Sequence, residues 1–172
     1  MNKTICNTSQ QLSLNLCGTK VKDPSVLKNI HTLDLSDCYI IEDVSALGNT
    51  HTLNLSDCYL VKDIFTLKNV YNLDLSGCYL IEDVSALGNV HNLILDGCNL
   101  LTDVSALGNV YDLSLHNCEN LEDISALGKN HTLHISWCQK ITDVSMLGNV
   151  HDLCLFYCMN ITNITTLHNA IY

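Results

Sequence analysis

The sequence predicts a repeat solenoid, with short parallel β-strands on a concave face, 3₁₀ or extended returns on a convex face, and little or no α-helix. Three observations predict this fold class. Leucines recur with a period of twenty residues, a cysteine recurs in register with them, and so does an aspartate. A fixed period of this length is typical of stacked repeats, because one unit cannot bury its apolar side alone.

The repeat is easiest to see from His31 onward. Seven rows of twenty residues begin HTLDLSDC, HTLNLSDC, YNLDLSGC, HNLILDGC, YDLSLHNC, HTLHISWC and HDLCLFYC. A degenerate coil precedes them, in which Leu14 and Leu16 match the pattern after a one-residue deletion. We therefore expect one solenoid of about eight coils over residues 11–170, numbered here from coil 1 (11–30) to coil 8 (151–170). Residues 1–10 form an irregular N-terminal cap, and residues 171–172 an end without a separate cap.

The first half of each coil predicts a short strand. In an L-x-L segment such as Leu73 to Leu75, the leucines point inward and their polar neighbours point outward. Strands one coil apart then pair in parallel at a spacing of about 4.8 Å.

The second half of each coil predicts a tight return, as in D-V-S-A-L-G-N from Asp83 to Asn89. The aspartate can accept a hydrogen bond from a backbone N–H two or three residues later, while Val84 and Leu87 point into the core. Gly88 and Asn89 tolerate a positive φ, which we expect the return to the next strand to need. Twenty residues leave no room for a full helix, so a 3₁₀ turn or an extended segment is expected.

The cysteine column consists of Cys38, Cys58, Cys78, Cys98, Cys118, Cys138 and Cys158. It could be a metal site, a disulfide ladder or a stack of buried thiols. Zinc needs four ligands that converge, which a straight column does not offer, and seven cysteines cannot all pair. Buried structural thiols are the favoured interpretation, because free cysteine suits a small apolar position. Cys154 lies outside the column between two leucines, and we expect it to be an exposed, reactive thiol.

Two further columns have structural and functional interpretations. The aspartates from Asp23 to Asp143, followed by Asn163, suggest calcium or local capping, and capping is favoured because the sequence lacks the glycine-rich calcium repeat. The ring column comprises His31, His51, Tyr71, His91, Tyr111, His131 and His151. Stacking of flat rings along one edge is favoured. Metal binding by neighbouring histidines is the weaker alternative, and no cofactor is expected.

The pattern resembles a known family. Val70, Leu73, Leu75, Cys78 and Leu80 spell V-x-x-L-x-L-x-x-C-x-L, which resembles the leucine-rich repeat consensus. The segment C-Q-K-I-T-D, at 138–143, resembles the cysteine-containing subclass of F-box proteins, and the D-[VI]-S-x-L half resembles bacterial internalin-type repeats. Both relatives have longer repeats. The resemblance implies a parallel-strand solenoid whose concave face binds a macromolecular partner, usually a protein.

Composition excludes several other classes. The formal net charge is −10, and all eight basic residues are lysines, so the chain would repel a nucleic acid. The sequence lacks the run of about 20 apolar residues that a transmembrane helix needs. It also shows no apolar stretch of signal-peptide length, so we expect a cytoplasmic protein that does not bind membranes. Absence of nucleophile-elbow, zinc-protease, P-loop and dinucleotide-binding motifs predicts a protein that is not an enzyme.

The outward strand positions, where the coils differ, predict the binding surface. The first half of the concave face is small and acidic, and the second half gathers aromatic and histidine residues. The predicted partner-binding residues are Asp34, Asp37, Asp57, Asp74, His116, His134, Trp137, Cys154, Phe156 and Tyr157. The aromatic residues would anchor a protein partner, and the aspartates would steer its basic region. The alternative is a self-associating structural protein, a homodimer for example, formed through the aromatic residues and the uncapped C-terminal end.

Overall fold

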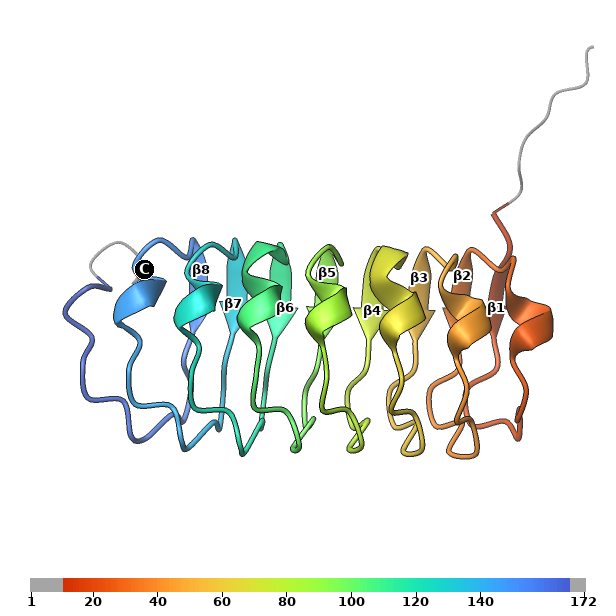
Figure 1. Cartoon of the computed structure of the whole chain (residues 1–172), viewed down its shortest axis with the longest axis horizontal. Helices are drawn as coiled ribbons and strands as arrows, with labels where there is room; N and C mark the ends of the chain where they lie inside the picture. The colour runs from red at the N-terminus through yellow and green to blue at the C-terminus, as the bar shows by residue number, and fades with distance from the viewer. Residues whose placement is uncertain (1–10, 168–172) are drawn as a thin grey trace, which may run out of the picture.

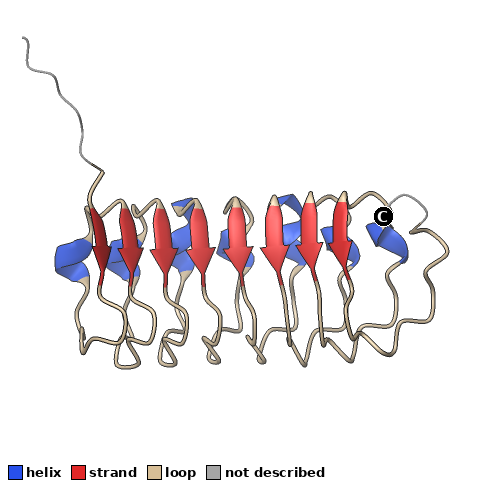
Figure 2. Ribbon diagram, turned by 180° about the vertical axis from the view of Figure 1, so that it is seen from behind, coloured by secondary structure: helices blue, strands red, loops and turns tan. Residues whose placement is uncertain are grey.

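The fold is one parallel sheet of eight short strands, arranged in chain order along the molecule (Figures 1 and 2). It is seen in a computed structural model, which describes residues 11–167. The predicted cap at 1–10 and end at 171–172 lie outside the described residues. The strands are β1 (Ser13–Asn15), β2 (Thr32–Asp34), β3 (Thr52–Asn54), β4 (Asn72–Asp74), β5 (Asn92–Ile94), β6 (Asp112–Ser114), β7 (Thr132–His134) and β8 (Asp152–Cys154). Figure 2 shows the strands side by side in one row, so the face predicted to be concave is a broad, continuous surface.

Short 3₁₀ helices form the returns and lie behind the sheet, as predicted (Figure 2). They are η1 (Ser25–Leu27), η2 (Ser45–Leu47), η3 (Phe65–Asn69), η4 (Ser85–Leu87), η5 (Ser105–Asn109), η6 (Ser125–Leu127) and η7 (Ser145–Leu147). Each is three to five residues long. No helix between residues 11 and 167 therefore has the length and apolar character to cross a membrane.

Strand pairing confirms the register read from the repeat. Leu53 lies opposite Leu73, and every later pair of strands keeps the same offset of twenty residues. Coil 1 pairs with an offset of nineteen, because Leu14 lies opposite Leu33. The one-residue deletion is therefore absorbed outside the strand, and the degenerate coil joins the same sheet.

The core is a set of stacked rows, each filled by one position of the repeat. The two strand leucines, the cysteine, and the aliphatic residues of the return are almost fully buried from coil 2 to coil 7. One detail of the consensus differs. Leu80, read as the last leucine of the repeat pattern, is 42% exposed, whereas its neighbour Ile81 is fully buried. The buried aliphatic residue after the cysteine therefore lies one position later than the pattern indicates.

The cysteine column is a ladder of buried free thiols. All seven members are buried, and the described cysteines are all free. Each thiol donates to the carbonyl oxygen of the residue that directly follows the strand of the preceding coil, as Cys78 does to Leu55 O at 3.2 Å. This acceptor is a leucine in six cases and Ile135 in the seventh. Cysteine therefore fills a small apolar position and also gives a backbone acceptor a second donor.

The aspartate column caps the returns, as predicted. The Oδ1 atom of Asp83 accepts a hydrogen bond from the backbone N–H of Ser85 at 2.8 Å, and the other aspartates of the column repeat this contact. At the end of the column, Asn163 accepts the equivalent bond from Thr165 N at 3.2 Å. Local capping thus satisfies these side chains.

The position of the left-handed residue differs from the prediction. Gly88 has a φ of −60°, so the expected positive φ at this return is wrong. The left-handed residue lies instead just before each cysteine, where the chain turns sharply off the sheet, as at Gly77 and Gly97. Gly88 is required for a different reason: a Cβ there would collide with the carbonyl oxygen of Ala106 in the next coil.

The capping contacts predict how stability depends on pH. Hydrogen bonds from Ser85 lower the pKa of Asp83 below its usual value, and serine donors do the same at Asp103 and Asp123. Because the folded pKa lies below the unfolded value, this contribution is present above about pH 4 and is lost as pH falls further. We expect the urea midpoint to fall with acidification across this range. A triple D83N/D103N/D123N variant, whose amides can still cap, should show a shallower fall; an unchanged slope would contradict this assignment.

Candidate functional site

The acidic residues predicted on the first half of the sheet face have partly structural roles. Asp34 Oδ1 accepts hydrogen bonds from the N–H and Oγ of Ser36 at 3.0 and 2.7 Å. Asp74 makes the same pair of bonds to Ser76, at 2.9 and 2.6 Å. These contacts lie where the strands β2 and β4 end.

Six of the predicted contact residues lie past the ends of their strands, namely Asp37, Asp57, His116, Trp137, Phe156 and Tyr157. Four of them, Asp37, Asp57, Trp137 and Tyr157, have φ values of 57°, 58°, 63° and 58°. The prediction that these six are strand residues is therefore wrong. The reason is that the chain leaves the sheet after the second leucine of the repeat, and a left-handed residue starts the turn. These residues therefore lie along the edge of the sheet at which the strands end.

The predicted aromatic residues come together in one cluster, the aromatic patch, formed by Trp137, Phe156 and Tyr157. The rings of Trp137 and Tyr157 stack with centroids 4.3 Å apart, and Phe156 meets Tyr157 edge-on at the same distance. Gln139 Nε2 donates to the carbonyl oxygen of Tyr157 at 2.7 Å, which holds the turn. All three rings are exposed, Phe156 to 60%. Contiguous exposed aromatic surface of this kind is typical of interaction sites.

The remaining predicted residues, His116, His134 and Cys154, lie in coils 6 to 8. His134 is exposed and lies opposite Cys154 in the register of β7 and β8. The backbone N–H of the exposed His116 donates to Asp96 Oδ1 at 2.8 Å. Cys154 is only partly accessible, whereas Cys17 is exposed. The expectation that Cys154 is the exposed thiol is therefore wrong, and one group close to its Sγ is the Oγ of Ser136, at 3.9 Å.

The acidic and aromatic residues form two separate surfaces. The four aspartates lie in coils 2 to 4, and the aromatic patch lies in coils 7 and 8. Three strand spacings separate β4 from β7, which is about 14 Å. A single partner would have to extend along the sheet to contact both surfaces.

The ring column forms a continuous stack, as predicted. Six successive ring pairs, from His31–His51 to His131–His151, have centroid distances of 4.4 to 4.9 Å. The two histidine pairs are nearly parallel, with interplanar angles of 10° and 16°. In-plane nitrogen lone pairs of parallel rings do not converge on one point, so the stack disfavours a shared metal ion. Within residues 11–167, no three potential ligands gather around a metal position.

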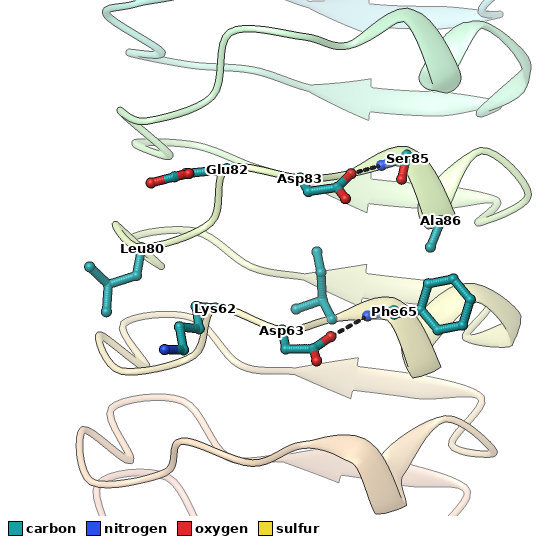
Figure 3. Close-up of a pocket in the computed structure, with 9 residues that line it drawn as sticks. Lys62, Asp63, Phe65, Leu80, Glu82, Asp83, Ser85 and Ala86 are labelled. Carbon is teal, nitrogen blue, oxygen red and sulfur yellow. Dashed lines mark hydrogen bonds between the residues drawn. The ribbon is translucent and has the colours of Figure 1, made fainter.

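A hollow of about 480 Å³ lies on the return side between coils 3 and 4. Figure 3 shows that Asp63 and Asp83 each point toward a backbone N–H, of Phe65 and Ser85 respectively, and not toward the space. Lys62 and Leu80 lie at its outer margin (Figure 3). The two carboxylates therefore act as caps, and the hollow is the gap between successive capped returns.

A second exposed apolar surface was missed by the sequence analysis. It follows the corner where each coil turns from the sheet to its return, and we call it the corner strip. Its members are Tyr39, Tyr59, Leu60, Tyr79, Leu80 and Leu100. The signal is the repeated C-Y-[IL] segment of coils 2 to 4, in which the leucines were read as part of the buried consensus.

The stacked strands, 3₁₀ returns and cysteine ladder define the fold class: the chain is a leucine-rich repeat solenoid. Among solved structures it is similar to an internalin C2 from Listeria monocytogenes, with 28% identity and a TM-score of 0.75; the match covers 91% of this chain and 76% of that one. Leucine-rich repeat proteins of this kind generally serve as protein–protein interaction modules and are typically not enzymes.

Two further structures share the fold. The functional domain of InlJ from Listeria monocytogenes, which includes a cysteine ladder, is 23% identical with a TM-score of 0.54, and the match covers 77% of this chain and 30% of that one. A leucine-rich repeat protein of Leptospira interrogans is 17% identical with a TM-score of 0.51, covering 91% and 54%. No protein-family model matches the sequence, and no curated protein matches it either.

Thiol reactivity should follow this geometry. Burial raises the pKa of Cys58 and of Cys98 to about 12, so roughly one thiol in ten thousand is ionised at pH 8. Brief alkylation of the native protein, read by peptide mass spectrometry, should label Cys17 first and Cys154 more slowly. The ladder cysteines should be labelled only after denaturation. Native labelling of Cys58 at the rate of Cys17 would show that the ladder is open.

Proposed function

We propose that this chain is a non-enzymatic protein-binding module whose aromatic patch is buried against a partner protein. The acidic residues of coils 2 to 4 steer a basic region of that partner. The observation that carries this proposal is the backbone conformation of Trp137 and Tyr157.

Bulky aromatic residues are costly at these two positions. The equivalent left-handed residues in coils 2 to 6 are Asp37, Asp57, Gly77, Gly97 and Asn117, which tolerate a positive φ. Strain of this type costs on the order of 1–3 kcal/mol per residue. Drift on an unused surface would not favour two neighbouring strained aromatic residues. Their retention is therefore best explained by a contact that they make.

The chemistry of the patch suits protein recognition. Tryptophan and tyrosine are enriched among the residues that dominate binding energy, and stacked rings lose little side-chain entropy when a partner covers them. The acidic surface would act at longer range, by increasing the association rate of a positively charged partner. Asp37 and Asp57 border the same edge of the sheet as the patch, so an extended partner could follow that edge.

Stability measurements test the strain argument. Replacing both residues by asparagine, as in W137N/Y157N, removes ring stacking worth about 0.5–1.5 kcal/mol but also relieves the backbone strain. We expect the variant to unfold within about 4 °C of the wild type. Leu133→Ala, which empties a fully buried position, should instead cost about 2–5 kcal/mol. A loss of that size in W137N/Y157N would show that the patch is structural.

Site-specific crosslinking tests the binding surface. With benzoylphenylalanine in place of Phe156, extracts of the source organism should give a discrete adduct that disappears in the W137N/Y157N background. The same crosslinker in place of Phe65, an exposed ring on the return side, is the matched control and should not give that adduct. An adduct common to both positions, or none from Phe156, would contradict the proposal. A self-adduct in the purified protein would favour the self-associating alternative.

A further inference from the structure

The corner strip is an unusually long exposed apolar surface. Its three tyrosines and three leucines are each between 40% and 48% exposed. They occupy four consecutive coils, because the strip begins at Tyr39 in coil 2 and ends at Leu100 in coil 5. The same positions are polar in coils 6 and 7, where Glu119, Asn120 and Lys140 replace them. The continuous strip therefore ends in coil 5, and a single exposed apolar residue, Met159, recurs at the tyrosine position in coil 8.

The repeat distance of the strip matches that of an α-helix. The rings of Tyr59 and Tyr79 stack with centroids 5.5 Å apart. One turn of an α-helix advances about 5.4 Å, so successive turns of a helix laid along the strip would meet successive coils. Four coils correspond to about four turns, or roughly fifteen residues. The helix would present one apolar side chain per turn, in the i, i+3/i+4, i+7 pattern of helices that dock by an apolar face.

The margins of the strip carry a net negative charge. On the sheet side Asp37 and Asp57 border the tyrosines, and on the return side Glu42 and Glu82 alternate with Lys62. Figure 3 shows Leu80 projecting at the corner near Glu82 and near Lys62 of the preceding coil. Residues 31–90 contain nine acidic residues against two lysines, a formal charge of −7.

The negative field extends to the ring surface itself. The Asp57 carboxylate is the main reason that the pKa of Tyr59 lies above its usual value. A cation that approaches this ring would therefore be attracted by the aspartate and by the ring face. An acidic partner, or a second copy of this chain with the same charges, would be repelled by the carboxylates of coils 2 to 4.

We propose that the corner strip of coils 2 to 5 is a docking surface for an amphipathic helix of a partner protein, with an apolar stripe flanked by lysine or arginine. This surface is separate from the aromatic patch. The negative charge around the strip selects a basic partner, and the spacing of successive coils matches the rise of one helical turn. The apolar stripe covers the tyrosines and leucines, and the basic flanks meet the carboxylates on both margins.

A synthetic peptide pair tests the proposal on the full-length protein. The probe has about fifteen residues, with leucine at i, i+4, i+7 and i+11 and lysines on both sides of that stripe. The control has the same composition in a scrambled order, which keeps the charge but removes the stripe. We expect the probe to bind at least tenfold more tightly than the scrambled peptide, to gain helical circular dichroism on binding, and to bind more weakly as salt is raised.

Matched variants locate the site. Y59S/Y79S/L80S, which changes only exposed residues and no charge, should weaken probe binding at least tenfold. The control F65S/M146S removes exposed apolar residues from the return side and should bind as the wild type does. W137N/Y157N should also bind the probe normally, so failure of this inference and failure of the proposed function are distinguishable. Thermal unfolding curves confirm that each variant is folded.

Three outcomes would overturn the proposal. Equal binding of the probe and the scrambled peptide would show diffuse electrostatic attraction without a docking site. Unchanged binding to Y59S/Y79S/L80S would place the peptide elsewhere. Light scattering that shows a wild-type dimer, together with a monomeric Y59S/Y79S/L80S variant, would identify a second copy of this chain as the occupant.

Discussion

In-register pairing of parallel strands is the interaction on which the rest of the structure depends. Because each strand lies opposite the equivalent residues of the next coil, every position of the repeat becomes a row of near neighbours about 4.8 Å apart. Each position of the repeat can therefore hold only a side chain that packs against the equivalent side chains of the adjacent coils. Leucines pack, thiols donate to the preceding coil, and flat rings stack. Aspartates would repel one another, and local capping bonds together with solvent screening offset that repulsion.

The same rule explains which parts of the fold could be predicted from the sequence. A row is recognisable in the sequence when the same kind of side chain recurs every twenty residues, apolar in Leu73 and Leu93 and flat-ringed in Tyr71 and His91. The structure confirms the strands, the buried thiols and the ring stack that these rows predict. The prediction of a positive φ at Gly88 is wrong because a glycine in the sequence has two possible structural causes. It can supply a positive φ, or it can leave room for a neighbouring atom. Gly77 has a positive φ, whereas Gly88 makes room for a neighbouring carbonyl oxygen.

The binding surfaces were predicted less completely, for physical reasons. Trp137, Phe156 and Tyr157 were correctly grouped because aromatic residues are rare in this chain and these fall in adjacent coils. Their strain could not be read from sequence, since φ depends on where the chain leaves the sheet. The corner strip was missed because Leu80 and Ile81 are equally apolar, and only the packing shows that Ile81 is buried and Leu80 is not. The result is a molecule with distinct surfaces on its two halves.

The near identity of the coils makes the distance between those surfaces adjustable. The segment EDVSALGN occurs unchanged at 42–49 and at 82–89, and the strand register keeps the same offset through all the later coils. Recombination between such copies would insert or remove whole coils without disturbing any row of the core, because each new coil finds the same neighbours. Each event would move the two ends of the solenoid apart or together by about 4.8 Å. The length of the solenoid can therefore change during evolution in uniform steps of one coil, while its two surfaces remain intact.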